Sequence, residues 1–169
     1  MKIVHKSKLT SREVDRLFRW REHVFSPLAP GIEMSALTHH YVMLDDDEAV
    51  AHAQCEVRVL ERQGKRRPIL GIGAVVVRPE YQGKKLGHEL LKHLHGLLGS
   101  SFDAQAAWLF CMPELIRYYE LSGYREVKSP VCFEQSTGLV LCPWVSMIYE
   151  RPPGLFEDNS EIIIRSKPW

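Results

Sequence analysis

The segment from Val75 to Leu91 constrains the fold of this chain more than any other part of its sequence. It starts with the apolar run VVV, passes through the short turn RPEYQGKK, and enters a stretch in which leucines recur at helical spacing. Pro79 lacks a backbone donor and therefore ends the strand. The nearly continuous apolar run from Ile69 to Val77 predicts a strand buried on both faces. A buried strand that leads through a tight turn into a helix is typical of an α/β protein.

The turn itself has the features of an anion site. Backbone N–H groups in the first turn of a helix lack partners, and the helix dipole favours negative charge there. Gly83 lets the backbone approach an anion closely, and Lys84 and Lys85 add positive charge. These features suit a pyrophosphate, although an ordinary turn with a solvated lysine pair is an equal alternative on the turn alone. The Walker A and dinucleotide-binding spacings are both missing, which argues against NTP hydrolysis and hydride transfer.

Elsewhere, periodicity and turn residues predict a single mixed α/β domain over residues 1–169, with 128–169 as a C-terminal extension. Gly71 and Gly73 interrupt the buried strand and indicate a bulge or a close backbone approach. Three helices are expected: from Thr10 or Ser11 to about Phe25, over 83–98, and over 113–121. Strands are expected at 1–5, 40–44, 49–60, 69–77, 106–111 and 124–127, with shorter candidates at 139–141, 145–149 and 161–165.

Composition narrows the classes of partner and compartment. The chain has 22 basic and 21 acidic side chains, and a net charge of +1 does not favour a nucleic-acid partner bound through its phosphates. The four cysteines form no CxxC pair, and the N-terminus lacks the apolar core of a signal peptide, so a reduced, cytoplasmic setting is expected. No apolar run is long enough to span a membrane. Three helical histidines lack the spacing of a metal site, and no metal is expected.

A family resemblance appears at the strand–turn–helix segment. V-x-V-x-P-E-Y-Q-G-K-x-L-G, followed by a leucine-rich helix, resembles the acetyl-CoA motif of the GNAT superfamily of N-acetyltransferases. In that family the loop reads Q/R-x-x-G-x-G/A, and Lys85 stands at its middle glycine. The resemblance implies a mixed central sheet, splayed at the cofactor strand and flanked by helices. The strand's open backbone groups would pair with the pantetheine arm. The implied cofactor-binding residues are Val75, Val76, Val77, Gln82, Gly83, Lys84, Lys85, Leu86 and Gly87.

A second stretch, I-R-Y-Y-E-L-S-G-Y from Ile116 to Tyr124, resembles the A-x-x-F-Y-E-K-x-G-F segment of the same family. The match aligns Tyr119 with the tyrosine whose hydroxyl faces the cofactor sulfur. The resemblance therefore implies that Tyr119 protonates the leaving thiolate. On sequence grounds alone, two adjacent tyrosines on a helix are more often packing residues.

The general base is left open between several residues. A lysine-like amine with a pKa near 10.4 is protonated at pH 7, and freeing its lone pair costs about 4–5 kcal/mol. Many family members carry a glutamate on the strand before the motif, but the stretch from Leu70 to Ala74 has no carboxylate. Glu56 and His52 on the preceding strand are the candidates, and Glu33 is a further acidic candidate near the acceptor.

The acceptor is expected between segment 27–37 and the C-terminal tail, because long irregular stretches in compact domains are often functional. Glu33 and the terminal Trp169 are the substrate-binding candidates, and the alternative is a tail that only covers the sheet. The G-K-R-R-P hairpin and the position of Trp169 also resemble the layout of aminoglycoside 2'-N-acetyltransferases.

The expected function is transfer of an acetyl group from acetyl-CoA to a primary amine by direct attack. The acceptor would be a small molecule or a peptide, and a homodimer is possible. The alternative is a non-catalytic acyl-CoA-binding regulatory module on the same fold, since the strand glutamate is missing and Lys85 replaces a glycine. A longer acyl chain, or an acceptor on protein or tRNA, is a third possibility.

Overall fold

The long strand β3 (Glu48–Arg62) is the spine of the sheet, because it pairs with different strands along its two halves. Its first half pairs with β2 (His39–Asp45), which in turn pairs with β1 (Lys2–Lys6). Its last residues pair with β10 (Ile162–Ile164). Along most of its length it also pairs with β4 (Lys65–Val77) in an antiparallel hairpin. The computed structural model describes residues 1–20, 31–154 and 160–169.

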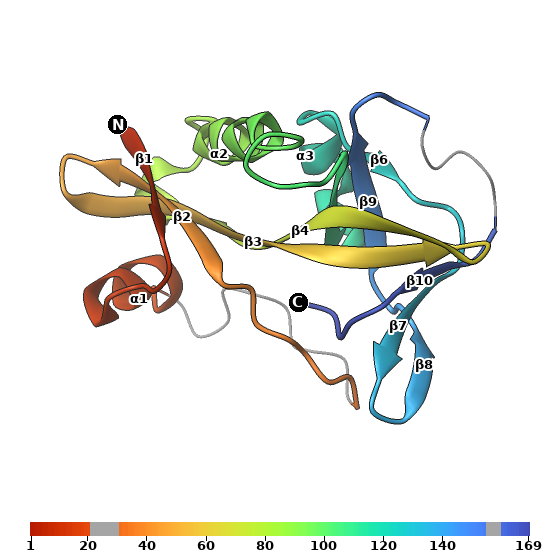
Figure 1. Cartoon of the computed structure of the whole chain (residues 1–169). Helices are drawn as coiled ribbons and strands as arrows, with labels where there is room; N and C mark the ends of the chain where they lie inside the picture. Colours follow the sequence, from red (N-terminus) through yellow and green to blue (C-terminus); the bar gives the residue numbers. More distant parts are fainter. Residues whose placement is uncertain (21–30, 155–159) are drawn as a thin grey trace.

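The remaining strands extend the sheet on both sides of this hairpin. The strand order is β6-β9-β5-β4-β3-β10-β7-β8, with β1 and β2 off this path. The strands not yet introduced are β5 (Ala106–Cys111), β6 (Arg125–Glu126), β7 (Val131–Gln135), β8 (Gly138–Leu141) and β9 (Val145–Glu150). In Figure 1, helices α2 (Leu86–Gly96) and α3 (Ile116–Glu120) lie on one side of the sheet, and α1 (Ser11–Phe18) and the C-terminus lie on the other. The predicted mixed α/β architecture is confirmed.

Helix α2 packs its regularly spaced leucines against the sheet. Leu90, Leu91 and Leu94 are fully buried and contact a cluster that includes Leu70 and Ile72 of β4. Burying each such side chain contributes about 1.5–3 kcal/mol. The helix begins at Leu86, three residues later than expected from Gly83, because Gly83 and Lys85 both adopt a positive φ that a right-handed helix excludes.

Helix α1 begins where the sequence predicts and ends earlier than expected. Thr10 caps it, and Glu13 completes a capping box with Thr10. The described helix stops at Phe18, with Arg19 as its C-cap. The residues expected to extend and end it, from Val24 to Pro30, lie in 21–30, outside the described residues.

Strands β4 and β5 separate soon after they meet. Their parallel register comprises only two pairs, Leu70 with Ala107 and Gly71 with Trp108. The sheet is therefore splayed at β4, as the family resemblance implies. The other expected strands are confirmed to within a few residues, whereas β7 was not predicted. No helix among the described residues is long and apolar enough to cross a membrane.

Candidate functional site

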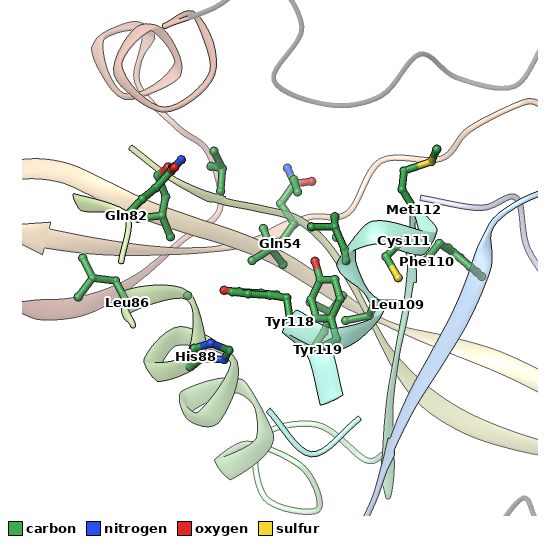
Figure 2. A pocket seen from close by; sticks show the side chains of 18 of the residues that line it. Gln54, Gln82, Leu86, His88, Leu109, Phe110, Cys111, Met112, Tyr118 and Tyr119 are labelled. Carbon is green, nitrogen blue, oxygen red and sulfur yellow. The ribbon is translucent and has the colours of Figure 1, made fainter. Parts of the chain in front are cut away.

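A groove of about 1100 Å³ opens where β4 and β5 diverge. One wall is β4 from Ile72 to Val77, and the opposite wall is β5 from Leu109 to Cys111. The first residues of α2 and the tyrosines of α3 close one side (Figure 2). Two paired strands would leave no space between them, so the separation of β4 and β5 is what creates this groove.

The turn before α2 leaves the first backbone N–H groups of the helix without a side-chain cap. Lys85 is the N-cap and has a left-handed backbone with φ 62°. Gly83 has φ 76°, and nothing lies within 4 Å of the position where a Cβ would stand. The lysine therefore takes the conformation that a glycine adopts freely, at a cost of about 1–2 kcal/mol. The turn keeps an open, electropositive helix N-terminus facing the groove.

The expected cofactor residues are placed at the groove with one exception. Lys84 is not among the lining residues, and its Nζ lies 4.6 Å from the ring centroid of Tyr81. The Gln82 side chain folds back so that its Nε2 donates to the Val77 carbonyl oxygen at 3.0 Å. The expected residues that line the groove are Val75, Val76, Val77, Gln82, Gly83, Lys85, Leu86 and Gly87.

A bulge in β4 sets the direction of its backbone groups. Ala74 has φ 47°, and the register with β3 shifts opposite it, between His52 and Gln54. The fully buried His52 donates from Nδ1 to the Ala74 carbonyl oxygen at 2.9 Å. In a trans peptide the carbonyl and the following N–H point to opposite sides. Because the Ala74 carbonyl points toward the His52 ring, the Val75 N–H points away from that ring, and Val75 itself lines the groove.

His52 is held neutral by its surroundings. Burial lowers its pKa to about 4, although the hydrogen bond to Ala74 opposes that shift. Its Nε2 lies 3.1 Å from Nδ1 of His40, and the ring of Phe18 packs edge-on at 5.1 Å. With Nδ1 protonated toward Ala74, the Nε2 of a neutral ring accepts from His40. This arrangement stabilises the bulge and leaves His52 no opening to the groove.

The two tyrosines of α3 point in different directions. In Figure 2 the Tyr119 ring rises from α3 between the walls, toward the side of Gln54, whereas the Tyr118 ring extends toward α2. Tyr119 is 7% exposed, and burial raises its pKa far above 10, so its hydroxyl stays protonated. A Cβ built on Gly87 would lie 1.9 Å from the Tyr118 hydroxyl, so Gly87 is what admits this hydroxyl to the helix N-terminus.

The thiol in the groove is not an activated nucleophile. Cys111 ends β5 at the groove wall, and burial raises its pKa to about 11. A reactive cysteine has a lowered pKa and a partner that stabilises the thiolate. Cys111 therefore offers no route to an acyl-enzyme.

The candidate bases do not reach the groove. Glu56 is not among the lining residues, and its carboxylate pairs with Arg58 at 3.2 Å. His52 is fully buried behind the bulge. Glu114 is the only side-chain carboxylate among the described lining residues, and it lies on the exposed 3₁₀ turn Pro113–Leu115.

The C-terminal tail forms part of the groove wall. The Trp169 ring packs on the glycines of β4, where a Cβ on Gly71 would lie 2.7 Å from it and one on Gly73 would lie 3.0 Å from it. Its Nε1 donates to the Ile72 carbonyl oxygen at 3.0 Å. The close backbone approach predicted from these glycines is thus confirmed, with Trp169 as the partner. Glu33 lies elsewhere: Lys167 at 2.8 Å and Ser136 at 2.6 Å occupy its carboxylate and lower its pKa to about 2.

Several lining residues were not singled out from the sequence. Gln54 gave no signal beyond its place in an alternating strand, and Tyr118 was attributed to packing. Phe110 and Met34, which gave no signal either, line the groove together with Met112 and Trp144. Their proximity depends on pairing of distant strands, which no local pattern encodes.

Comparison with known proteins gives the same fold. A family model described as an acetyltransferase (GNAT) domain matches residues 6–127. The matched range contains the strand–turn–helix segment and both tyrosines. No curated protein matches the chain.

Solved structures share this architecture at low identity. An acyl-CoA N-acyltransferase from Pseudomonas aeruginosa matches with a TM-score of 0.56 and 21% identity, over 88% of this chain and 98% of that one. A candidate N-acetyltransferase from Lactobacillus plantarum gives a TM-score of 0.57 and 17% identity, over 88% and 97%. The GNAT family N-acetyltransferase YhbS from Escherichia coli, in complex with CoA, gives 0.54 and 16%, over 76% and 68%. The finer resemblance to aminoglycoside 2'-N-acetyltransferases is not confirmed by these matches.

Proposed function

Because the chain belongs to the acetyltransferase (GNAT) domain family, we propose that it transfers an acetyl group from acetyl-CoA to a primary amine. The observation that carries the proposal is the convergence of two backbone features on one groove. The uncapped N-terminus of α2 suits a pyrophosphate, and the bulge at Ala74 turns the Val75 N–H away from His52 at a residue that lines the space between β4 and β5. An unrelated groove would have no need of both.

The residues of the turn and of β4 would hold the two ends of the cofactor. N–H groups from Leu86 onward, with the Lys85 charge nearby, would bind the pyrophosphate. The backbone of Val75–Val77, which has no partner strand on the β5 side, would pair with the pantetheine arm. The open Cβ direction at Gly83 supports close approach of a phosphate to this turn.

In the proposed reaction the neutral amine attacks the thioester carbonyl carbon. A C–N bond forms and the C–S bond breaks, giving an amide and a thiolate. The Val75 N–H would stabilise the negative charge that develops on the carbonyl oxygen. The ammonium substrate loses two protons in all. One is released to solvent, and the other balances the protonation of the thiolate, so the products are an amide, CoA thiol and one proton.

Tyr119 is the proposed donor to the thiolate. Its hydroxyl is protonated at every pH at which the protein would operate, which a donor requires. Glu56 is left out of the proposed machinery, because Arg58 holds its carboxylate outside the groove. The first proton would then leave the amine through solvent before the attack, without a dedicated carboxylate.

An amine screen that detects released thiol tests the proposal. The protein is incubated with acetyl-CoA and a panel of primary amines, and free CoA is measured against samples without amine. Amine-dependent thiol release is expected. The non-catalytic alternative predicts instead that calorimetry detects CoA binding while no amine increases thiol release above background.

A further inference from the structure

Besides the β4 backbone and the turn into α2, the groove is lined by a group of aromatic and sulfur-containing side chains. We define the aromatic chamber as Phe110, Trp144, Trp169, Met34 and Met112, all of which line the groove and are partly exposed. The Phe110 ring centroid lies 4.9 Å from that of Trp169 and 6.2 Å from that of Trp144. These separations are typical of interacting rings, so β5, the loop before β9 and the tail form one continuous apolar surface.

The tail is fixed in place rather than lying loosely over the groove. The backbone N–H of Ser35 donates to the Pro168 carbonyl oxygen at 2.7 Å, and Lys167 pairs with Glu33 at 2.8 Å. Together with the indole hydrogen bond to Ile72, these contacts hold the Trp169 ring in one orientation. A preorganised ring loses little entropy when a ligand packs on it.

The chamber also lies next to the proposed reaction centre. Cδ1 of Trp169 is 3.0 Å from the position of a Cβ on Gly73, and Gly73 directly precedes the bulged Ala74. A molecule whose amine reaches the groove beside Val75 would therefore place the carbon skeleton attached to that amine against these rings.

Nearby carboxylates are already paired. The Glu33 carboxylate contacts Lys167 and Ser136, and the Glu56 carboxylate contacts Arg58. Among the described lining residues Glu114, at the exposed rim, is the only one with an acidic side chain, and Trp169 carries the terminal carboxylate. A second or third ammonium group on the acceptor would lose hydration against these apolar side chains and would find few carboxylates to pair with, which is unfavourable.

We propose that the acceptor is a primary amine carried on an aromatic or flat apolar body, and that the aromatic chamber binds this body. The inference rests on the proposed acetyl transfer and specifies its substrate class. It disfavours polycationic acceptors such as polyamines and aminoglycosides. An apolar chamber also favours the uncharged form of the bound amine, which is the form that attacks.

A comparison of kcat/KM between aromatic and non-aromatic acceptors tests this substrate class. Tryptamine and phenethylamine are compared with ethanolamine, spermidine and kanamycin in the thiol-release assay, each at equal concentration of the unprotonated amine. Burial of an aromatic body predicts about 10- to 100-fold higher kcat/KM for the first two. A higher kcat/KM for spermidine or kanamycin would overturn the substrate class while leaving acetyl transfer in place.

Variants then locate the preference. Trp169→Leu and Trp144→Leu are expected to reduce the tryptamine-to-ethanolamine ratio at least about 10-fold, mainly through KM, with CoA affinity by calorimetry unchanged. Trp169→Phe keeps a ring but loses the bond to Ile72, so it should retain more of the ratio than Trp169→Leu. Leu141→Ala, at an exposed position outside the groove lining, is the control. An unchanged ratio in both Leu variants, with CoA affinity intact, would overturn the role of the chamber.

A binding measurement separates failure of this inference from failure of the proposed function. Tryptamine is titrated into the protein saturated with CoA, which cannot donate an acetyl group, and binding is followed by calorimetry. Binding that Trp169→Leu weakens supports the chamber even if no amine is acetylated. Acetylation of other amines without any binding of tryptamine would overturn the chamber and keep the transferase.

Discussion

Tyr119 illustrates how a residue's burial decides what its chemistry contributes. Its ring lies in the core between α3 and the groove, and burial raises the pKa of the phenol far above 10. The hydroxyl is therefore a permanent donor and never a base. The sequence resemblance identified the residue, but the direction of its ring and its protonation state came only from the packing around α3.

Replacing Tyr119 with Phe removes the proposed donor and keeps the ring. We expect kcat for acetyl transfer to fall about 10²- to 10⁴-fold, the range for a lost general acid, with little change in CoA affinity. Tyr118→Phe is the matched control, because its hydroxyl lies beside Gly87 rather than between the groove walls. Steady-state kinetics of both variants provides the measurement, and equal turnover in wild type and Tyr119→Phe would exclude the role.

His52 is expected to act as a positioning residue, because its ring bonds to the bulge at Ala74 and does not line the groove. His52→Leu removes the donor to the Ala74 carbonyl, while His52→Asn places an amide N–H close to the position of the lost Nδ1. If the bond holds the bulge, kcat should drop at least about 10-fold in the Leu variant and recover substantially in the Asn variant. A purely structural histidine predicts the reverse, because Leu fits the buried site better than Asn. Kinetics combined with unfolding curves distinguishes the two.

At the level of elements, the turn into α2 depends on a contact between two motifs that are separate in the sequence. Gly87 and Tyr118 touch so closely that a Cβ on Gly87 would overlap the tyrosine hydroxyl. We expect Gly87→Ala to destabilise the protein by about 1–3 kcal/mol, as overpacking does, and to weaken CoA binding. Tyr118→Phe in the same chain should restore most of both losses. Denaturant unfolding and calorimetry of the single and double variants check this, and additive losses would show that the contact is not the cause.

The elements that the sequence predicts well are those with a strong local pattern. Three such patterns each extend over a few residues: the leucine repeat of α2, the apolar run of β4 and the Gly71–Gly73 interruption. The helix, the strand and the close approach that they predict are all confirmed. β7 was missed because Cys132, Glu134 and Gln135 dilute its alternation, and its pairing with β10 joins strands about thirty residues apart. The contact between Trp169 and β4 joins residues 97 positions apart, and no local sequence pattern indicates it.

The site could be predicted only as far as its motifs extend. The β4 strand, the turn into α2 and Tyr119 were identified because each belongs to a short, contiguous motif. The aromatic chamber instead assembles from β5, the segment before β2, the loop before β9 and the tail. Glu33 and Glu56 were reasonable from charge alone. Lys167, which pairs with Glu33, comes from a distant part of the chain, whereas Arg58 lies two residues from Glu56 on the same face of β3, a spacing that indicates the pair.

For the molecule as a whole, two buried histidines couple stability to pH. Burial lowers the pKa of His52 and of His95 to about 4, from an ordinary 6.5. Between these values the unfolded chain binds protons that the folded chain does not, so stability is full above about pH 6.5 and falls as the pH falls toward 4. Glu33 and Glu61, with pKa values lowered to about 2, stay ionised throughout this window.

We therefore expect the free energy of unfolding to drop by up to about 1.4 kcal/mol per pH unit for each histidine as the pH is lowered below about 6. Replacing His95 with Gln, which removes one of the two groups, should make the dependence shallower. Denaturant titrations at pH 7, 6 and 5 measure the slope. A constant unfolding free energy over this range would show that the two rings do not titrate as their burial requires.

We propose that this molecule joins an acetyl group to an amine in the groove between β4 and β5. Mass spectrometry of tryptamine after incubation with the protein and acetyl-CoA bearing a deuterated acetyl group tests it most directly. We predict that the label appears as an amide on the amine nitrogen, in an amount equal to the CoA thiol released, and that Tyr119→Phe slows both together. Label found only as free acetate, or no label transfer to tryptamine or to any other amine of the panel by protein that binds CoA, would show that the groove does not carry out acetyl transfer.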